Sequence, residues 1–407
     1  MSFDSIFTTL YRSPVAVLPT SITLPGLGEA GGADLALLRP ALVGAVECAD
    51  GLLDRLQNQV LAFGQIQSHL DALDDQLAGI AEQLTTLAPG EHSPTPAQNE
   101  RAYRAAVDAF GPLLAEACAV YDDYFGVVRV PEMGLLPLLG QVVRTSQAIL
   151  RDLPYTLLDR TQIVMLAANI GRMLAAVSQR LSEGEGNSAP AASRADDRQV
   201  YHRGWQQTAT PEGWSETVAF YRWKLGHHFF DLCTIFCGDA LGQAHAAIAK
   251  GDEPIAVTQL ALADAFLRGT TAAMWYAGDF PANLYRDVVR PSMIMPGKAS
   301  GFSGDQNADY NRMKDAKERL KAFLCQHYGP DLAGLSPRLR RAFLQFHEAD
   351  IEDNEHHLII AAHKVGMDQS LAQKEWQDEL PAHVHRQMAV DVLREMAESK
   401  RREFVSR

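Results

Sequence analysis

Hydrophobic residues recur three or four positions apart along most of the chain. Such spacing places apolar side chains on one face of a helix. Alternating apolar and polar runs between turns, which predict strands, are not convincing anywhere in the sequence. The pattern therefore predicts an all-α fold. Its helices are expected at about residues 35–88, 97–124, 137–153, 159–181, 211–247, 254–277, 308–328, 337–366 and 381–403.

Proline, glycine and small polar residues divide these helices into two groups. Residues 1–34 are rich in proline and glycine, so we expect an irregular lead-in. Residues 182–197 are small and polar and predict a flexible linker or loop. This division predicts a helical N-terminal domain at 35–181 and a helical C-terminal domain at 198–407.

Composition narrows the class of protein. The 407 residues are 47% hydrophobic and 21% charged, which is ordinary for a soluble protein with a sizeable core. The net charge of −13 argues against binding to nucleic acid or to an anionic membrane. No secretory signal is apparent, and no apolar run reaches the roughly 18 residues of a membrane span. The five scattered cysteines do not predict disulfides, which favours a cytoplasmic protein with reduced thiols: Cys48, Cys118, Cys233, Cys237 and Cys325.

The expected helix at 337–366 carries the first candidate for chemistry. His357 lies beside an apolar stripe that includes Ile351, Leu358 and Ala361, and Gly366 is placed to end the helix. Imidazole is the commonest metal ligand in proteins, and a histidine on an apolar helix suits the proximal side of a haem iron. Spacing alone more often indicates a structural or surface histidine.

A second candidate lies on the expected helix at 211–247. Phe220, Trp223, His227 and Phe230 fall on one face, at spacings of three, four and three. Such a face is either an aromatic core stripe or one wall of a pocket for a flat ligand. Further along, residues 296–307 form a loop rich in glycine and serine, whose small residues allow the backbone to approach a ligand. The loop does not match a phosphate-binding motif.

Three pieces of the C-terminal half together resemble the haem-dependent tryptophan and indoleamine dioxygenases and the wider superfamily of haem-dependent aromatic oxygenases. The first piece runs from Asp279-Phe280-Pro281 to Arg290-Pro291. The second, Ala299-Ser300-Gly301-Phe302-Ser303, is similar to the family's loop over the haem. The third is His357 with Gly366 nine residues later, the family's spacing of proximal histidine and helix-ending glycine. The resemblance covers roughly residues 215–370.

This resemblance implies a multi-helix haem-binding bundle and an enzyme that uses haem b. His357 would be the proximal iron ligand, with the adjacent His356 as the alternative, because helix register from sequence is uncertain. Ser300, Gly301, Ser303 and His227 would be the catalytic residues, and Gly301 and Phe302 would also contact the haem. A small aromatic substrate, with O₂ or peroxide, would contact Phe220, Trp223, Lys224, Phe302 and one of three arginines that can bind a carboxylate, Arg286, Arg290 or Arg312. A homo-oligomer is compatible with the sequence.

The sequence also departs from the family. The position expected to hold a substrate-binding arginine after the loop is Ala308, and Arg312 lies one turn later. The glycine-rich loop after the proximal helix is replaced by Met367-Asp368-Gln369-Ser370. The leading hypothesis is dioxygenation of an indole such as tryptophan, and the first alternative is hydroxylation of an aromatic ring in a specialised biosynthetic pathway.

Two alternatives of other classes remain. A non-haem di-iron oxidase would use the carboxylates and histidines at 347–363, but the Glu-x-x-His motif of such sites is missing. A non-catalytic helical interaction protein would be built around residues 35–88. Within the haem hypothesis, Glu352, Asp353 and Glu355 are candidates to hold the His357 ring, and Asp353 is best placed because it lies one turn earlier.

Overall fold

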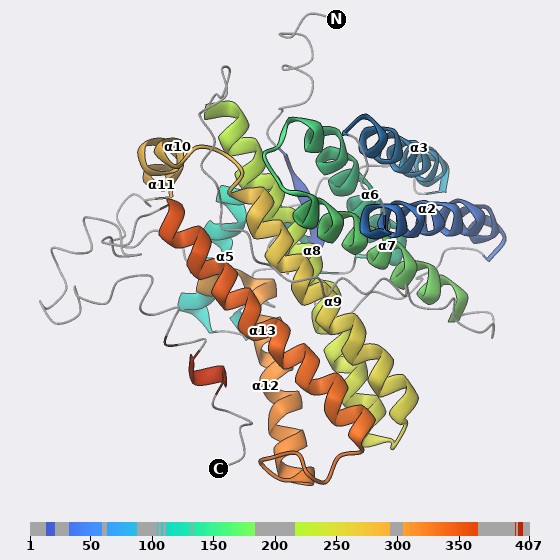
Figure 1. The fold of residues 1–407 in the computed structure, drawn as a ribbon, viewed down its shortest axis with the longest axis vertical. Helices are drawn as coiled ribbons and strands as arrows, with labels where there is room; N and C mark the ends of the chain where they lie inside the picture. The colour runs from blue at the N-terminus through green and yellow to red at the C-terminus, as the bar shows by residue number, and fades with distance from the viewer. Residues whose placement is uncertain are drawn as a thin grey trace, which may run out of the picture. The chain divides into compact units, whose positions relative to one another are not determined.

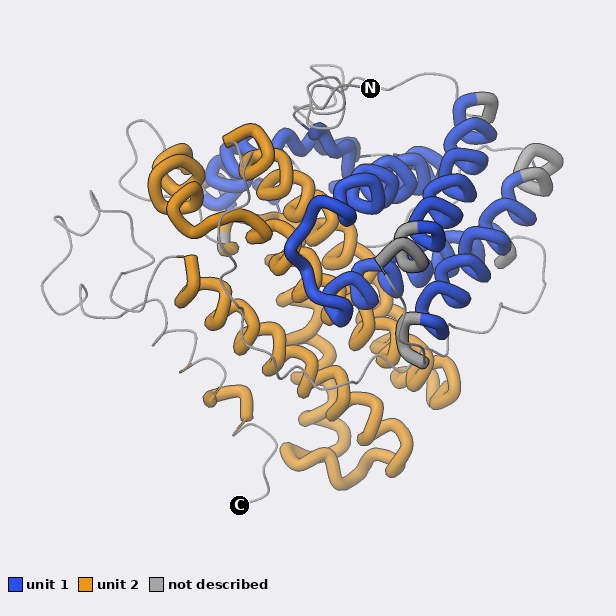
Figure 2. Tube along the Cα trace, turned by 45° about the horizontal axis from the view of Figure 1, so that its top comes forward, with its two compact units in different colours: residues 1–201 blue, residues 202–407 orange. Residues whose placement is uncertain are grey.

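The structure is a computed structural model, which describes residues 14–20, 32–58, 63–87, 104, 107–108, 111–131, 133–183, 216–293, 304–364, 395 and 398–401 (Figure 1). The chain forms two compact units, residues 1–201 and 202–407 (Figure 2). The division falls close to the predicted linker, most of which lies outside the described residues. In the described part nearly all regular structure is helical, so the all-α prediction is confirmed.

Unit 1 is built on long helices that pack side by side. Helix α2 packs against α7 and α3, and α3 packs against α6. The contact between α2 and α7 is close, because a Cβ added at Gly171 would lie 2.8 Å from the Cβ of Ala49. The elements are β1 (Ala16–Pro19), α2 (Gly32–Asn58), α3 (Phe63–Leu87), α5 (Pro112–Phe125), β2 (Val127–Val130), α6 (Leu135–Asp152), η1 (Leu153–Tyr155) and α7 (Arg160–Glu183).

Two short strands correct the prediction that the chain has no strands. Strands β1 and β2 pair in parallel, with Ala16 opposite Val127. Each strand has four residues, which is too short for a visible alternation of apolar and polar positions. Gly126 allows the sharp exit from α5 into β2, because its φ of 71° is left-handed and an added Cβ would lie 3.0 Å from the Pro14 carbonyl oxygen. Part of the expected irregular lead-in is therefore a strand.

Unit 2 carries the predicted site, and its described helices begin and end close to the expected positions. Helix α9 packs against both α8 and α13, and α12 packs against α8. Asp252 accepts a hydrogen bond from the Ile255 backbone N–H and so caps α9 after the tight turn at Gly251. The elements are α8 (Glu216–Ala249), α9 (Glu253–Ala277), α10 (Ala282–Leu284), the π-helix η2 (Tyr285–Val289), α11 (Arg290–Ser292), η3 (Gly304–Gln306), α12 (Ala308–Tyr328) and α13 (Pro337–Lys364).

Helices α7 and α8 are long and apolar enough to pass a length-and-composition test for a membrane span. Their apolar windows are 78% and 72% buried within the protein, as expected for core helices. The five cysteines are free thiols, as predicted, and three of them are buried.

Candidate functional site

Helix α8 carries one half-buried face within an otherwise buried segment. The four predicted residues Phe220, Trp223, His227 and Phe230 are all half-buried, as is Lys224, whereas the residues between them are buried. The structure therefore brings the predicted face together at the expected helical spacing.

Aromatic contacts extend this face to neighbouring elements. The Trp223 ring lies edge-on to the His227 ring, with ring centroids 4.4 Å apart, and to the Tyr285 ring of η2 at 5.6 Å. Phe230 lies 5.8 Å from Tyr310 in the first turn of α12. Phe220 and Trp223 also pack against a small core of Ala219, Phe280 and Val289. The stripe thus belongs partly to the core and partly to an aromatic wall beside His227.

The His227 imidazole is held in one tautomer. Its Nδ1 donates a hydrogen bond to the Trp223 carbonyl oxygen at 2.6 Å, so the lone pair of the neutral ring resides on Nε2. Burial lowers the pKa of His227 to about 3; the charges of His228 and His357 add to this shift, and the bond to Trp223 opposes it. His227 is therefore neutral at physiological pH, the form in which histidine binds a metal.

His357 presents an accessible ring on α13. The side chain is exposed, and Ile359, two residues on, is 42% exposed. Although the side chain is exposed, desolvation by the neighbouring protein lowers the pKa of His357, and the charge of His357 acts on His227. The two histidines, from α8 and α13, therefore lie within electrostatic reach of one another and both favour the neutral form.

The neighbouring His356 has a different environment. It is buried, and its Nδ1 accepts a hydrogen bond from the Trp275 indole N–H at 3.3 Å. Its ring lies edge-on to the Trp275 ring at 5.8 Å. His356 thus points toward α9 and uses one ring nitrogen there, which leaves His357 as the better candidate for a ligand.

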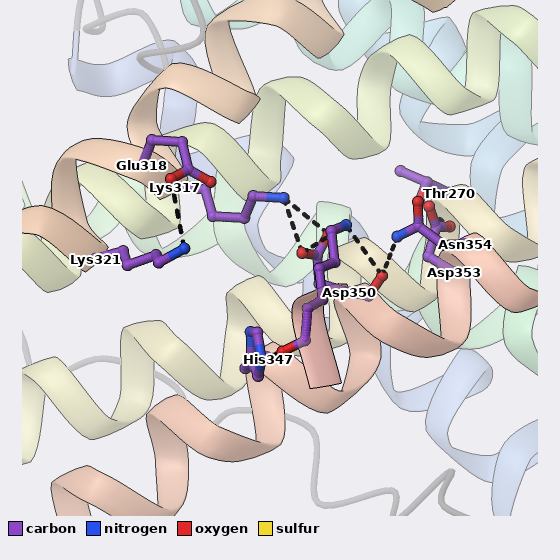
Figure 3. A network of polar contacts seen from close by, with 9 residues as sticks. Thr270, Lys317, Glu318, Lys321, His347, Asp350, Asp353 and Asn354 are labelled. Atoms are coloured by element: carbon purple, nitrogen blue, oxygen red, sulfur yellow. Dashed lines mark hydrogen bonds and ion pairs between the residues drawn. The ribbon is translucent and has the colours of Figure 1, made fainter. Parts of the chain in front are cut away.

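The three acidic residues expected to hold His357 bond elsewhere. Asp353 Oδ1 accepts a hydrogen bond from the Thr270 hydroxyl on α9, at 3.0 Å (Figure 3), and another from the Thr271 hydroxyl, at 2.8 Å. Burial raises the pKa of Asp353 to about 6, and these two hydroxyls limit the shift. Glu352 pairs with Arg268, and Glu355 pairs with Arg401. The expectation that Asp353 holds the His357 ring is therefore not supported by its hydrogen bonds.

The carboxylates and histidines of α13 are separated rather than gathered. Asp350 pairs with Lys317 and Lys400, each at 2.8 Å, and His347 donates to the Lys400 carbonyl oxygen at 3.0 Å (Figure 3). Across the described parts of the chain, no group of three or more His, Cys, Asp or Glu residues is placed to hold a metal ion. This arrangement argues against the di-iron alternative.

The candidate substrate arginines differ in setting. Arg286 is exposed on η2, and Arg290 is half-buried at the start of α11. Arg312 lies 3.6 Å from the buried Asp309, one turn earlier on α12. The predicted pairing of one of them with a substrate carboxylate stays a prediction.

The glycine- and serine-rich loop is described only at its end. Ser300, Gly301, Phe302 and Ser303 lie outside the described residues. Immediately after them, Asn307 accepts a hydrogen bond from the Tyr310 backbone N–H, at 2.9 Å, and so caps α12. The Asn307 amide also donates to Asp231 Oδ1 at 2.6 Å. Asp231 lies one turn beyond His227 on α8, so the end of the loop is fixed beside the candidate site.

Sequence reasoning did not single out Tyr285, Tyr310, Asn307 or Asp231 for the site. Tyr285 begins a π-helix, and such segments are frequent at functional sites. Asn307 could have been found from its position before a helical run, where asparagine is a favoured cap. Nothing in the sequence pairs Asp231 with Asn307, since 76 residues separate them.

An all-helical unit with one neutral histidine against an aromatic wall, and a second histidine within electrostatic reach of it, fits the class of helical haem proteins. The fit rests on donor chemistry, because each ring offers an imidazole nitrogen and the surrounding side chains are largely apolar or aromatic. Among the described residues, His357 and His227 are the ones whose ring nitrogens could hold such a group.

Comparisons with known proteins place the chain within a family. Residues 37–342 match the family described as SfmD 3-methyl-L-tyrosine peroxygenase, which spans more than half of the chain. The chain therefore belongs to that family. The family is one of haem-dependent oxidoreductases, which agrees with the expected enzyme class and cofactor. The specific resemblance to tryptophan and indoleamine dioxygenases is not confirmed.

Two known proteins illustrate the likeness. The 3-methyl-L-tyrosine peroxygenase of Streptomyces lavendulae is 35% identical over 86 residues, which are 21% of this chain and 24% of that protein. The chain thus aligns with about a quarter of the length of this curated relative. A crystal structure of reduced SfmD, soaked with sodium hydrosulfite, is 19% identical, has a TM-score of 0.41, and is matched over 83% of this chain and 97% of its own.

Proposed function

We propose that this protein is a haem-dependent peroxygenase that hydroxylates the ring of an aromatic amino acid or a close derivative in a biosynthetic pathway. The family membership supports aromatic oxidation with peroxide. The observation in the structure that carries the proposal is the neutral His227 against Trp223 on the aromatic face of α8, within electrostatic reach of His357 on α13. This is the first alternative of the sequence analysis, and it replaces indole dioxygenation as the leading hypothesis.

In this proposal His357 binds the iron of haem b and Gly301 and Phe302 contact the cofactor. Bound haem supplies the transfer of oxygen from peroxide to the ring. The Nδ1 of His227 is committed to the Trp223 carbonyl oxygen, so Nε2 is the ring nitrogen that would face bound haem. A pKa of about 3 makes His227 a ligand or hydrogen-bond acceptor rather than a proton store at neutral pH.

The substrate would lie against the aromatic wall. Phe220, Trp223 and Phe302 would pack on its ring, and the hydroxyls of Ser300 and Ser303 would bond its polar groups. Lys224 shares the half-buried face with Trp223 and His227, and it is the cation of α8 best placed to bind a carboxylate. Arg286, Arg290 and Arg312, which flank the loop in the sequence, are the alternatives for this role.

The test is reconstitution of the purified protein with haem, followed by absorption spectroscopy of the ferric, ferrous and CO-bound states. We expect a Soret band in the wild type, and haem affinity at least roughly tenfold weaker in His357→Ala. His363→Ala is the matched control, since His363 lies on the same helix but outside the proposed site. Loss of the band in His356→Ala with an unchanged His357→Ala would assign the ligand to His356 instead.

The reaction is then tested with peroxide and a panel of tyrosine derivatives, tryptophan and indole. Products that gain one oxygen atom with the ring intact would support hydroxylation. Products of tryptophan that gain two oxygen atoms with an opened indole ring would restore the dioxygenase hypothesis. A wild-type protein that takes up no haem would refute the proposal.

A further inference from the structure

The last residue of α9 and the turn that follows it, together residues 277–280 and called this turn below, contact both histidine-bearing helices. On the α8 side, a Cβ added at Gly226 would lie 2.4 Å from the Cβ of Ala277. On the α13 side, a Cβ added at Gly278 would lie 3.5 Å from Cε of Lys364. The turn thus contacts α8 on one side and α13 on the other.

An ion pair ties this turn to α8. Arg222 Nη1 donates to the backbone carbonyl oxygen of Asp279 and to its Oδ2, both at 2.8 Å. The side chain of Arg222 is 1% exposed and that of Asp279 is 0% exposed. A guanidinium that bonds both a carboxylate and the carbonyl of the same residue fixes the direction as well as the distance of the contact.

A second cation ties the turn to α13. Lys364 is 3% exposed, and its Nζ donates to the carbonyl oxygen of Phe280 and lies 5.0 Å from the centre of the Phe280 ring. Burial lowers the pKa of Lys364 to about 8, against the opposing effect of the Asp279 carboxylate. The other charged or titratable groups here are Arg222, which pairs with Asp279, and His363 on the same helix.

We propose that Arg222, Asp279 and Lys364 form a clamp on this turn that sets the position of α8 relative to α13, and that they are positioning residues for the haem site. Arg222 precedes His227 by five residues, and Lys364 follows His357 by seven, or two helical turns. Two adjacent carbonyls, of Asp279 and Phe280, each accept a bond from a different histidine-bearing helix. The positioning role of the clamp rests on the proposed function, whereas the contacts that form the clamp are independent of it.

Burying three charged groups is a poor way to gain stability alone, because apolar side chains of similar size often stabilise a core as well or better. What charged groups add is direction, since each contact requires one arrangement of donor and acceptor. The clamp also explains the sequence Asp279-Phe280-Pro281, which the sequence analysis noted without a role. Pro281 follows at once as the N-cap residue of α10 and has no backbone N–H, so it could not continue α9.

The test uses Lys364→Met, which keeps an apolar stem and removes the ammonium group, with Lys250→Met as the control because Lys250 is exposed at the end of α8. In the full-length apoprotein, spin labels at Glu216→Cys and Ile359→Cys, in a background where Cys48 and Cys325 are serine, report the distance between α8 and α13. We expect a broader or shifted distance distribution in Lys364→Met and no change in Lys250→Met. An unchanged distribution in Lys364→Met would overturn the clamp.

Haem titration of the same variants gives the second readout. We expect haem affinity about tenfold lower in Lys364→Met than in wild type, as for other residues that orient a ligand indirectly. In wild type the affinity should fall as pH rises through about 8, where Lys364 loses its charge, and Lys364→Met should lack this step. Wild-type affinity and the same pH step in Lys364→Met would overturn the positioning role. If wild type binds no haem, the proposed function fails, and the spin-label distances still decide the clamp.

Discussion

The close approach of α8 to the end of α9 makes a direct prediction for Gly226→Ala. The new Cβ would lie 2.4 Å from Cβ, 2.6 Å from Cα and 2.8 Å from the backbone nitrogen of Ala277. Carbon atoms pack best at about 3.5–4.0 Å, so the helices must separate by roughly 1 Å. Two of the three contacted atoms belong to the backbone and cannot rotate away.

The magnitude follows from two opposing effects. Overpacking a well-packed core costs about 1–3 kcal/mol, and the backbone contacts here favour the upper end. Replacing glycine by alanine inside a helix stabilises it by about 1 kcal/mol. The net expectation is a loss of about 2 kcal/mol in the free energy of unfolding.

Gly242→Ala is the matched control on the same helix. Gly242 is exposed and has nothing within 4 Å of an added Cβ, so only the helix-propensity gain of about 1 kcal/mol applies. Urea unfolding followed by far-UV circular dichroism should therefore separate the two variants by about 3 kcal/mol. Ala277→Gly in the Gly226→Ala background should recover part of the loss. Equal stability of Gly226→Ala and Gly242→Ala would show that this contact does not set the spacing of α8 and α9.

Three further predictions concern pH and capping. His227 has a pKa of about 3 in the folded protein and about 6.5 in the unfolded chain, so between these pH values only the unfolded chain binds the proton. The free energy of unfolding therefore falls as pH drops through this window, by at most about 1.4 kcal/mol per pH unit. His227→Gln should remove this acid-dependent loss from unfolding curves measured over the same pH range. The pH dependence from Asp353 runs the other way, because its pKa of about 6 in the folded protein exceeds the value in the unfolded chain and the free energy of unfolding falls as pH rises toward 6. The stability of Asp353→Asn should therefore increase relative to wild type between about pH 4 and pH 7. A difference in stability between the two proteins that stays constant over that range would contradict the assignment. Asn307→Ala should lose about 2–3 kcal/mol, from the cap of α12 and the bond to Asp231, whereas the exposed Asn283→Ala should change thermal unfolding little.

Most helices of unit 2 were predictable because residues close to their ends in the sequence mark where they begin and stop. The expected helix 308–328 agrees with α12, since Asn307 is a favoured cap and Gly329 ends the helix with a positive φ of 89°. Pro337 similarly marks the start of α13. The expected single helix at 35–88 is instead divided into α2 and α3, because a continuous apolar spacing does not reveal where two helices meet.

The candidate site was predictable only in part. Helical periodicity sufficed to place His227 with the aromatic residues of α8, and the resemblance pointed to His357. The preference for His357 over His356 depends on Trp275, which is 81 residues distant, so no local pattern contains it. The Asp353 prediction is without support for a similar reason, because its Oδ1 bonds Thr270 and Thr271 on α9, which no local pattern reveals. Tyr285 was missed because a π-helix departs from the periodicity on which the prediction relied.

The buried pair of Arg222 and Asp279 has a consequence for how this family can diverge. Losing either partner alone would strand an uncompensated charge in the core, which typically costs about 3–5 kcal/mol. A loss of that size is close to the entire free energy of unfolding of many domains, so selection should remove single substitutions at Arg222 or Asp279. Exchange of both residues together for apolar ones would be tolerated far better. Related sequences should therefore either keep both charges or lack both, and the two positions should change as a unit.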